Sequence, residues 1–131
     1  MAPAQGKETI LLVEDEESLR TLTRTILERN GSAVLEARGG EEAIEIAQHH
    51  PSSIDLLLTD MVMPGMRGHE VARSLAAARP GIRVIYMSGY TGFSDRGPTQ
   101  PEDILLPKPI TREALLRKVH EVLRLQKAPV G

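Results

Sequence analysis

The stretch that decides the fold is Ile10-Leu11-Leu12-Val13-Glu14-Asp15, a short apolar run that ends in two acidic residues. Its four apolar residues are continuous, whereas a strand with one face in water would alternate apolar and polar residues. The run therefore predicts a parallel strand that is covered on both faces. Four further short apolar runs follow, at residues 33–37, 54–58, 84–87 and 104–106.

Longer amphipathic segments separate these runs and predict four clear helices, over about 16–28, 41–48 and 68–78 and from Thr111 onward. Strands that alternate with helices predict an α/β fold, with a doubly wound five-stranded parallel sheet and helices on both faces. Pro107 closes the last run, and proline is tolerated at a sheet edge, so the flavodoxin-like strand order 2-1-3-4-5 is favoured. Apolar residues keep helical spacing in the first and last helices, at Leu19, Leu22, Ile26 and Leu27 and at Leu115, Val119, Val122 and Leu123.

Residues 90–101 do not fit this alternation, although a helix is expected between the fourth and fifth strands. Two glycines and two prolines in the segment disfavour a regular helix, so we expect a fourth helix that is short or irregular. Residues 8–125 are predicted to form one domain, with flexible termini at 1–7 and 126–131.

The composition excludes several classes of protein. The 131 residues suit one domain, and without cysteine the chain has neither disulfides nor thiolate metal sites. A net charge of −2, no evident basic face and only 2% aromatic residues argue against nucleic-acid binding. No apolar run approaches the roughly 20 residues that span a bilayer. We therefore expect a cytoplasmic domain without membrane contact, as a monomer or a weak homodimer.

The ends of the predicted strands carry the chemistry. In a doubly wound sheet, ligands bind at the carboxyl ends of the strands, where the strand order reverses. Here these ends carry Glu14 and Asp15, Asp60, Ser88 and Lys108. Three carboxylates in one crevice repel one another, so either some are protonated or a cation neutralises them. Oxygen ligands of this kind select Mg²⁺ or a similar ion.

The same set of residues suits the transfer of phosphate to a carboxylate. Asp60 would be the nucleophile, Lys108 would supply a positive charge, and the Ser88 hydroxyl would donate a hydrogen bond to a phosphoryl oxygen. Each feature alone has an ordinary explanation, as a helix N-terminus, a turn or a solvated lysine. Their joint placement at one end of the sheet favours the functional interpretation.

Four segments carry a resemblance to a known family: residues 10–16 (ILLVEDE), 58–65 (LTDMVMPG), 86–89 (YMSG) and 107–109 (PKP). Together they resemble the signatures of response-regulator receiver domains of two-component signalling, and the resemblance covers about residues 8–125. It implies that Asp60 accepts a phosphoryl group from a phosphohistidine of a sensor histidine kinase or of a histidine phosphotransfer protein. It implies no other enzymatic activity than phosphorylation and dephosphorylation of the domain itself.

The resemblance also implies roles for the other residues of the site. Asp15, Asp60 and the backbone carbonyl of Val62 would bind Mg²⁺, and Glu14 would act on the ion indirectly, through a water. Lys108 would pair with the phosphoryl group, and Ser88 would move toward it. The bond between Lys108 and Pro109 is expected to be a cis peptide.

Two departures from the family pattern concern signalling. Leu105 stands three residues before Lys108, where the family usually has an aromatic residue. The second departure is the glycine- and proline-rich composition of residues 90–101, a segment that belongs to the usual signalling face of the family. Segments 6–16, 86–91 and 113–119 are similar to receivers at the C-terminus of hybrid sensor histidine kinases, which suggests that origin.

Two other functions compete with the receiver interpretation. A metal-dependent phosphohydrolase usually has a second aspartate two residues after the nucleophile, but this chain has Val62 there. A pseudo-receiver used only for protein contacts would have a broken acidic pocket. Val62 and Tyr90 are uncharged and bulky, so neither should position an attacking water. The phosphoaspartate should therefore be long-lived, and a Val62→Asn variant should lose phosphate faster.

Overall fold

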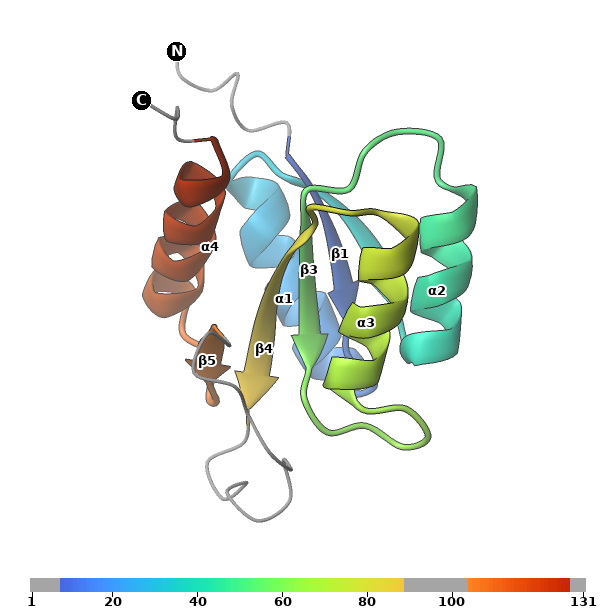
Figure 1. Cartoon of the computed structure of the whole chain (residues 1–131). Coiled ribbons are helices and arrows are strands. Elements are labelled where there is room, and N and C mark those ends of the chain that lie inside the picture. Colours follow the sequence, from blue (N-terminus) through green and yellow to red (C-terminus); the bar gives the residue numbers. More distant parts are fainter. Residues whose placement is uncertain (1–7, 89–103, 128–131) are drawn as a thin grey trace.

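The computed structural model describes residues 8–88 and 104–127. Its elements in chain order are β1 (Thr9–Val13), α1 (Glu17–Arg29), β2 (Ala33–Ala37), α2 (Gly40–His49), β3 (Leu56–Asp60), α3 (Gly68–Ala78), β4 (Arg83–Ser88), β5 (Leu105–Pro107) and α4 (Arg112–Lys127). The strands form one parallel sheet in the order β2-β1-β3-β4-β5 (Figure 1). The predicted α/β class, strand order and edge positions of β2 and β5 are confirmed.

Helices cover both faces of the sheet, and this explains the continuous apolar runs. Leu11 and Val13 of β1 belong to the core beneath α2 and α3. Ile10 and Leu12, which point the other way, belong to the core beneath α1 and α4. Figure 1 shows the two pairs of helices on opposite sides of the strands. Because successive strand residues face opposite cores, every position in the run must be apolar.

Strand β3 is shifted by two residues from the expected range of 54–58. It runs from Leu56 to Asp60, so Asp60 is the last residue of the strand itself. The Cα partner of Asp60 on β4 is Met87. Sheet hydrogen bonds therefore hold the backbone up to the acidic residue, which fixes where its side chain begins.

The inward face of α1 differs from the predicted apolar stripe. Leu22 is 51% exposed, so its placement in the stripe was wrong. The buried residues of the helix are Arg20, Thr23 and Leu27. These three also keep helical spacing, but two of them are polar, and a hydrophobic pattern does not detect them. In α4 the predicted stripe is confirmed, since Leu115, Val119, Val122 and Leu123 are all buried.

The helix ends follow the turn residues of the sequence. Gly31 after α1 and Gly81 after α3 have φ angles of 99° and 92°, which glycine adopts without strain. The backbone N–H of Ala114 donates to Thr111 Oγ1 at 3.1 Å, so Thr111 caps α4 as predicted. The flexible C-terminus expected at 126–131 was placed two residues too early, because α4 continues to Lys127. The expected irregular helix at 90–101 and the terminal residues 1–7 and 128–131 lie outside the described residues. Within the described ranges, no helix is long and apolar enough to cross a membrane.

Candidate functional site

Asp60 lies at the carboxyl end of β3, next to the start of α3. The residue is 6% exposed. A Cβ atom on Gly68, the first residue of α3, would lie 2.6 Å from the Asp60 backbone oxygen and 3.0 Å from Met61 Cα. Only glycine allows the helix to begin this close to the end of the strand. The Gly68 N–H donates to the Met61 carbonyl at 2.9 Å, which holds this approach.

Three carboxylates, including that of Asp60, converge at this point, as the sequence predicted. One carboxylate oxygen each from Glu14, Asp15 and Asp60 lie within 4.8 Å of one another. Glu14 is only 1% exposed, whereas Asp15 is open to solvent. They meet because Glu14 and Asp15 follow β1 directly and β1 is the parallel neighbour of β3.

Lys108 brings a positive charge into this acidic cluster. Its Nζ donates to Asp60 Oδ2 at 3.1 Å and lies 3.4 Å from Glu14 Oε1. The Lys108 N–H donates to the Ser88 carbonyl at 2.8 Å, which holds the Lys108 backbone beside the end of β4. The peptide bond between Lys108 and Pro109 is cis, as predicted. One lysine thus contacts two of the three acids.

The cluster shifts the protonation of its members. Burial and, next, the negative charge of Asp60 raise the pKa of Glu14 from 4.5 to about 7. Burial also raises the pKa of Asp60, against the opposing effect of Lys108. Burial would lower the pKa of Lys108, but the charges of Asp60 and Glu14 outweigh it and raise that pKa. The negative charge of the pocket is therefore only partly compensated by the protein.

The donor set fits a hard divalent cation. All three groups are carboxylates, which are the protein ligands that Mg²⁺ prefers. Glu14 Oε1 is buried without a hydrogen bond, although the Lys108 ammonium lies within ion-pair distance. A buried carboxylate oxygen of this kind is expected to have a further partner, and a cation in the cluster would supply charge on that side.

The remaining predicted site residues lie around the same strand ends. Ser88 is the last residue of β4, one position beyond the partner of Asp60, and is 6% exposed. Val62 is 44% exposed, and its backbone acts on the nearby Asp60 carboxylate to lower its pKa, an effect that burial outweighs. Tyr90, which was expected to flank the path of water, lies outside the described residues.

Two features near the site were missed by sequence reasoning. Arg20 of α1 is 9% exposed, and its Nη1 donates to the Glu14 carbonyl at 2.9 Å. Tyr86 is the cross-strand partner of Leu105, and its ring lies 4.6 Å from the ring of His69. The helical spacing of Arg20 with Thr23 and Leu27 was the available signal for the first.

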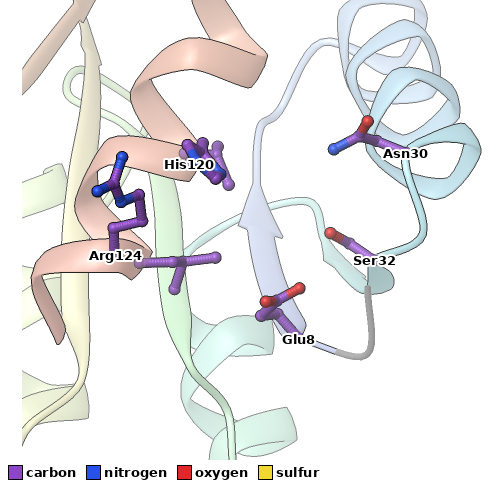
Figure 2. Close-up of a pocket in the computed structure, with 7 residues that line it drawn as sticks. Glu8, Asn30, Ser32, His120 and Arg124 are labelled. Carbon is purple, nitrogen blue, oxygen red and sulfur yellow. The ribbon is translucent and has the colours of Figure 1, made fainter. Parts of the chain in front are cut away.

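A separate hollow of about 190 Å³ lies at the opposite end of the strands, where they begin. In Figure 2, Asn30 and Ser32 near the end of α1 and Glu8 before β1 lie across from His120 and Arg124 of α4. This hollow is at the other end of β1 from Glu14 and shares no residue with the acidic cluster.

Comparison with known proteins identifies the family. The response regulator receiver domain family matches residues 10–120 of the chain. The chain is a response regulator receiver domain. A receiver domain from the hybrid histidine kinase CckA has a solved structure that is 33% identical, with a TM-score of 0.75 over 88% of this chain and 98% of that one. A response regulator receiver protein from Sinorhizobium medicae is 29% identical, with a TM-score of 0.77 over 92% and 97% of the two chains.

Curated relatives of this receiver domain are longer proteins. The sensor kinase CckA of Brucella abortus is 37% identical over 92% of this chain, which spans 13% of that protein. A cyclic di-GMP phosphodiesterase of Thermotoga maritima is 31% identical over 88% of this chain, which spans 31% of it. The receiver domain therefore corresponds to a minor part of each.

Proposed function

We propose that the domain accepts a phosphoryl group on Asp60 from a phosphohistidine, as a step in two-component signal transduction. One observation carries the proposal: Asp60 shares a pocket with Glu14 and Asp15, and Lys108 donates to its carboxylate at 3.1 Å. Asp60 itself is 6% exposed, but the neighbouring Asp15 is open to solvent, so a donor histidine would approach the pocket from that side.

In the proposed transfer, a carboxylate oxygen of Asp60 attacks phosphorus. A P–O bond forms, the P–N bond to the donor imidazole breaks, and the imidazole nitrogen keeps the electron pair. Lys108 would exchange its bond with Asp60 for one to a phosphoryl oxygen, and the Ser88 hydroxyl would donate to another. Both groups stabilise charge that is carried into the pocket with the phosphoryl group.

Mg²⁺ is the proposed cofactor, and Asp15, Asp60 and the backbone carbonyl of Val62 would hold it, with Glu14 in support. When bound, the ion offsets negative charge on the phosphoryl oxygens. The residues of the chain do the rest: they orient the carboxylate of Asp60 and keep one ammonium group beside it.

The test is phosphorylation in the presence of Mg²⁺, first with acetyl phosphate and then with a phosphorylated histidine kinase or histidine phosphotransfer protein. Mass spectrometry should locate one phosphoryl group on Asp60. Asp60→Asn should abolish it. Asp55→Asn is the matched control. Asp55 lies just before the same strand, at the end opposite to Asp60, and its carboxylate accepts the Thr9 N–H at 2.9 Å. Label on another residue, or none in the native protein, would refute the proposal.

We further infer that the domain works within a hybrid-kinase phosphorelay. The similarity to the CckA sensor kinase and to the solved CckA receiver supports this origin. In such a relay the domain should exchange phosphate rapidly with a histidine phosphotransfer protein. If phosphate passes only from a sensor kinase and never onward to a phosphotransfer protein, the relay assignment is wrong. Cytoplasmic location and a monomeric or weakly dimeric state remain predictions from the sequence.

A further inference from the structure

Arg20 is a buried cation that touches the acidic site from behind. It lies on α1, its side chain is 11% exposed, and it forms two hydrogen bonds. Nη1 donates to the Glu14 backbone carbonyl at 2.9 Å, and Nε donates to Glu36 Oε1 on β2 at 3.3 Å. The guanidinium thus joins the end of β1 to the neighbouring strand.

The sheet itself does not satisfy the carbonyl that Arg20 binds. The Glu14 N–H donates to the Ala37 carbonyl at 3.1 Å, and Ala37 is the last residue of β2. Beyond that residue the ladder between the two strands stops, so the Glu14 carbonyl has no backbone donor in the β2 strand. Arg20 supplies the next donor, and Glu36 balances its buried charge.

This bond acts on Asp15 through the peptide plane. The carbonyl of Glu14 and the N–H of Asp15 belong to one planar peptide group, so a fixed carbonyl also fixes the direction in which the chain enters Asp15. The Asp15 side chain is exposed, and packing therefore restrains it little. Its direction into the pocket depends mainly on the backbone that carries it.

We propose that Arg20 is a positioning residue, which holds the Glu14–Asp15 peptide in the orientation that aims Asp15 at the cation. This inference rests on the proposed function. It predicts that Arg20 controls the affinity for Mg²⁺ more than the transfer step itself. Residues that hold metal ligands from behind typically change metal affinity when they are mutated.

The chain offers a matched control on the same helix. Arg24 lies one turn after Arg20, and its Nε is 3.4 Å from Oε2 of the same glutamate, Glu36. Arg24 has no bond with the Glu14 carbonyl among the interactions of the described residues. Replacing either arginine by methionine removes a partner of Glu36 and keeps an apolar stem, but only Arg20→Met removes the bond to the peptide.

The experiment titrates native protein, Arg20→Met and Arg24→Met with MgCl₂ by calorimetry or NMR. Arg20→Met should raise the Mg²⁺ dissociation constant about tenfold, and Arg24→Met should stay within about twofold of native, as expected for a partly exposed ion pair. At saturating Mg²⁺, the acetyl phosphate rate constant of Arg20→Met should return to within about twofold of native, because binding and not transfer is impaired. Equal Mg²⁺ affinities in the two variants, or a slow rate at saturation, would overturn the proposal.

Arg20→Lys provides a second test in case Arg20→Met does not fold. Lysine keeps the charge but lacks the planar fork that reaches a carbonyl and a carboxylate together. Its Mg²⁺ affinity should therefore be weaker than native by about threefold or more, below the tenfold scale of complete loss. Native affinity in Arg20→Lys would contradict the proposal. If the native protein neither binds Mg²⁺ nor takes up phosphate, the proposed function fails instead, and the two failures remain distinct.

Discussion

The residues at the beginning of the strands and those at their end differ in how their charges are satisfied. Where the strands begin, Arg79 after α3 donates to three carbonyl groups, those of Ala47, His50 and Ser52, at 2.7–3.0 Å. These carbonyls lie at and beyond the end of α2, where helix carbonyls lack partners. Where the strands end, Glu14 and Asp60 share the ammonium group of Lys108, and Asp15 adds a third carboxylate to the cluster. The charge of Arg79, where the strands begin, is satisfied within the protein, whereas the negative charge where the strands end is only partly compensated.

This difference separates stability from function along each strand. A cation that is fully bonded within the chain stabilises the fold and has no capacity left for a ligand. A cluster with excess buried negative charge destabilises the isolated domain and favours a cation or a change in protonation. The comparison therefore predicts that substitutions where the strands begin change stability alone, while substitutions where the strands end change ligand binding as well.

The largest effect is expected for Arg79→Met. It should lower the free energy of unfolding by about 3 kcal/mol, because several charge-assisted hydrogen bonds to carbonyls are lost together. Urea denaturation measures this loss, and phosphorylation of the folded fraction should be unchanged. Arg73→Met changes an exposed arginine on the preceding helix, α3; it is the control and should have little effect. A similar loss in both variants would contradict the role given to Arg79.

The second effect is a loss of stability with rising pH when Mg²⁺ is absent. The folded-state pKa of Glu14, about 7, lies above its ordinary value of 4.5, so the folded protein holds this proton more tightly than the unfolded chain. The stabilisation is complete below pH 4.5 and is lost as the pH rises through 7. Between pH 5 and pH 7 the loss should be about 2 kcal/mol.

Urea denaturation with a chelator at several pH values tests this prediction. Glu14→Gln should remove most of the pH dependence, since the amide does not titrate. Saturating Mg²⁺ should reduce it as well, because an ion that binds the charged pocket stabilises the folded state. Constant stability from pH 5 to pH 7 in the metal-free native protein would show that Glu14 is not strained by burial.

A third, smaller effect concerns Gly68, which allows α3 to begin close to the end of β3. Gly68→Ala should cost about 1.5 kcal/mol, because its Cβ would contact the Asp60 and Met61 backbone, which has little room to move. It should also slow phosphorylation by displacing Asp60. Gly39→Ala is the control, since a Cβ there meets nothing within 4 Å and its φ of −168° suits any residue. If both variants behave alike in denaturation and phosphorylation, the close approach does not matter.

The sequence predicted the parts of the molecule that rest on local pattern. Continuous apolar runs gave the strands, and the acids and the lysine that follow them gave the site, because parallel strands must end at one edge. The inward face of α1 was not predictable in the same way. Arg20 is buried there because of a carbonyl and a glutamate on other strands, and neither is visible from the helix pattern.

The same limit applies to Arg79 and to the length of β3. Arg79 looks like a surface residue in sequence, and its carbonyl partners lie 27 to 32 residues away. Thr59 and Asp60 are polar, so a run of apolar letters ends before them, although both are buried and β3 includes them. Polar residues whose partners are distant in sequence need the fold before their role can be recognised.

The smallest effect tests the comparison within one strand. Asp55 lies just before β3 and Asp60 is its last residue, and each can be changed to asparagine. Asp60→Asn should raise the free energy of unfolding of the metal-free protein by about 1 kcal/mol, as expected where function conflicts with stability. It removes a buried charge beside Glu14 and Asp15, while Lys108 keeps Glu14 as a partner. Asp55→Asn should give no gain, because it only weakens the bond from the Thr9 N–H. Thermal unfolding of both variants with a chelator decides between these outcomes. A gain of stability in Asp55→Asn, or a loss in Asp60→Asn, would mean that the two ends of the strands do not differ in how well their charges are satisfied.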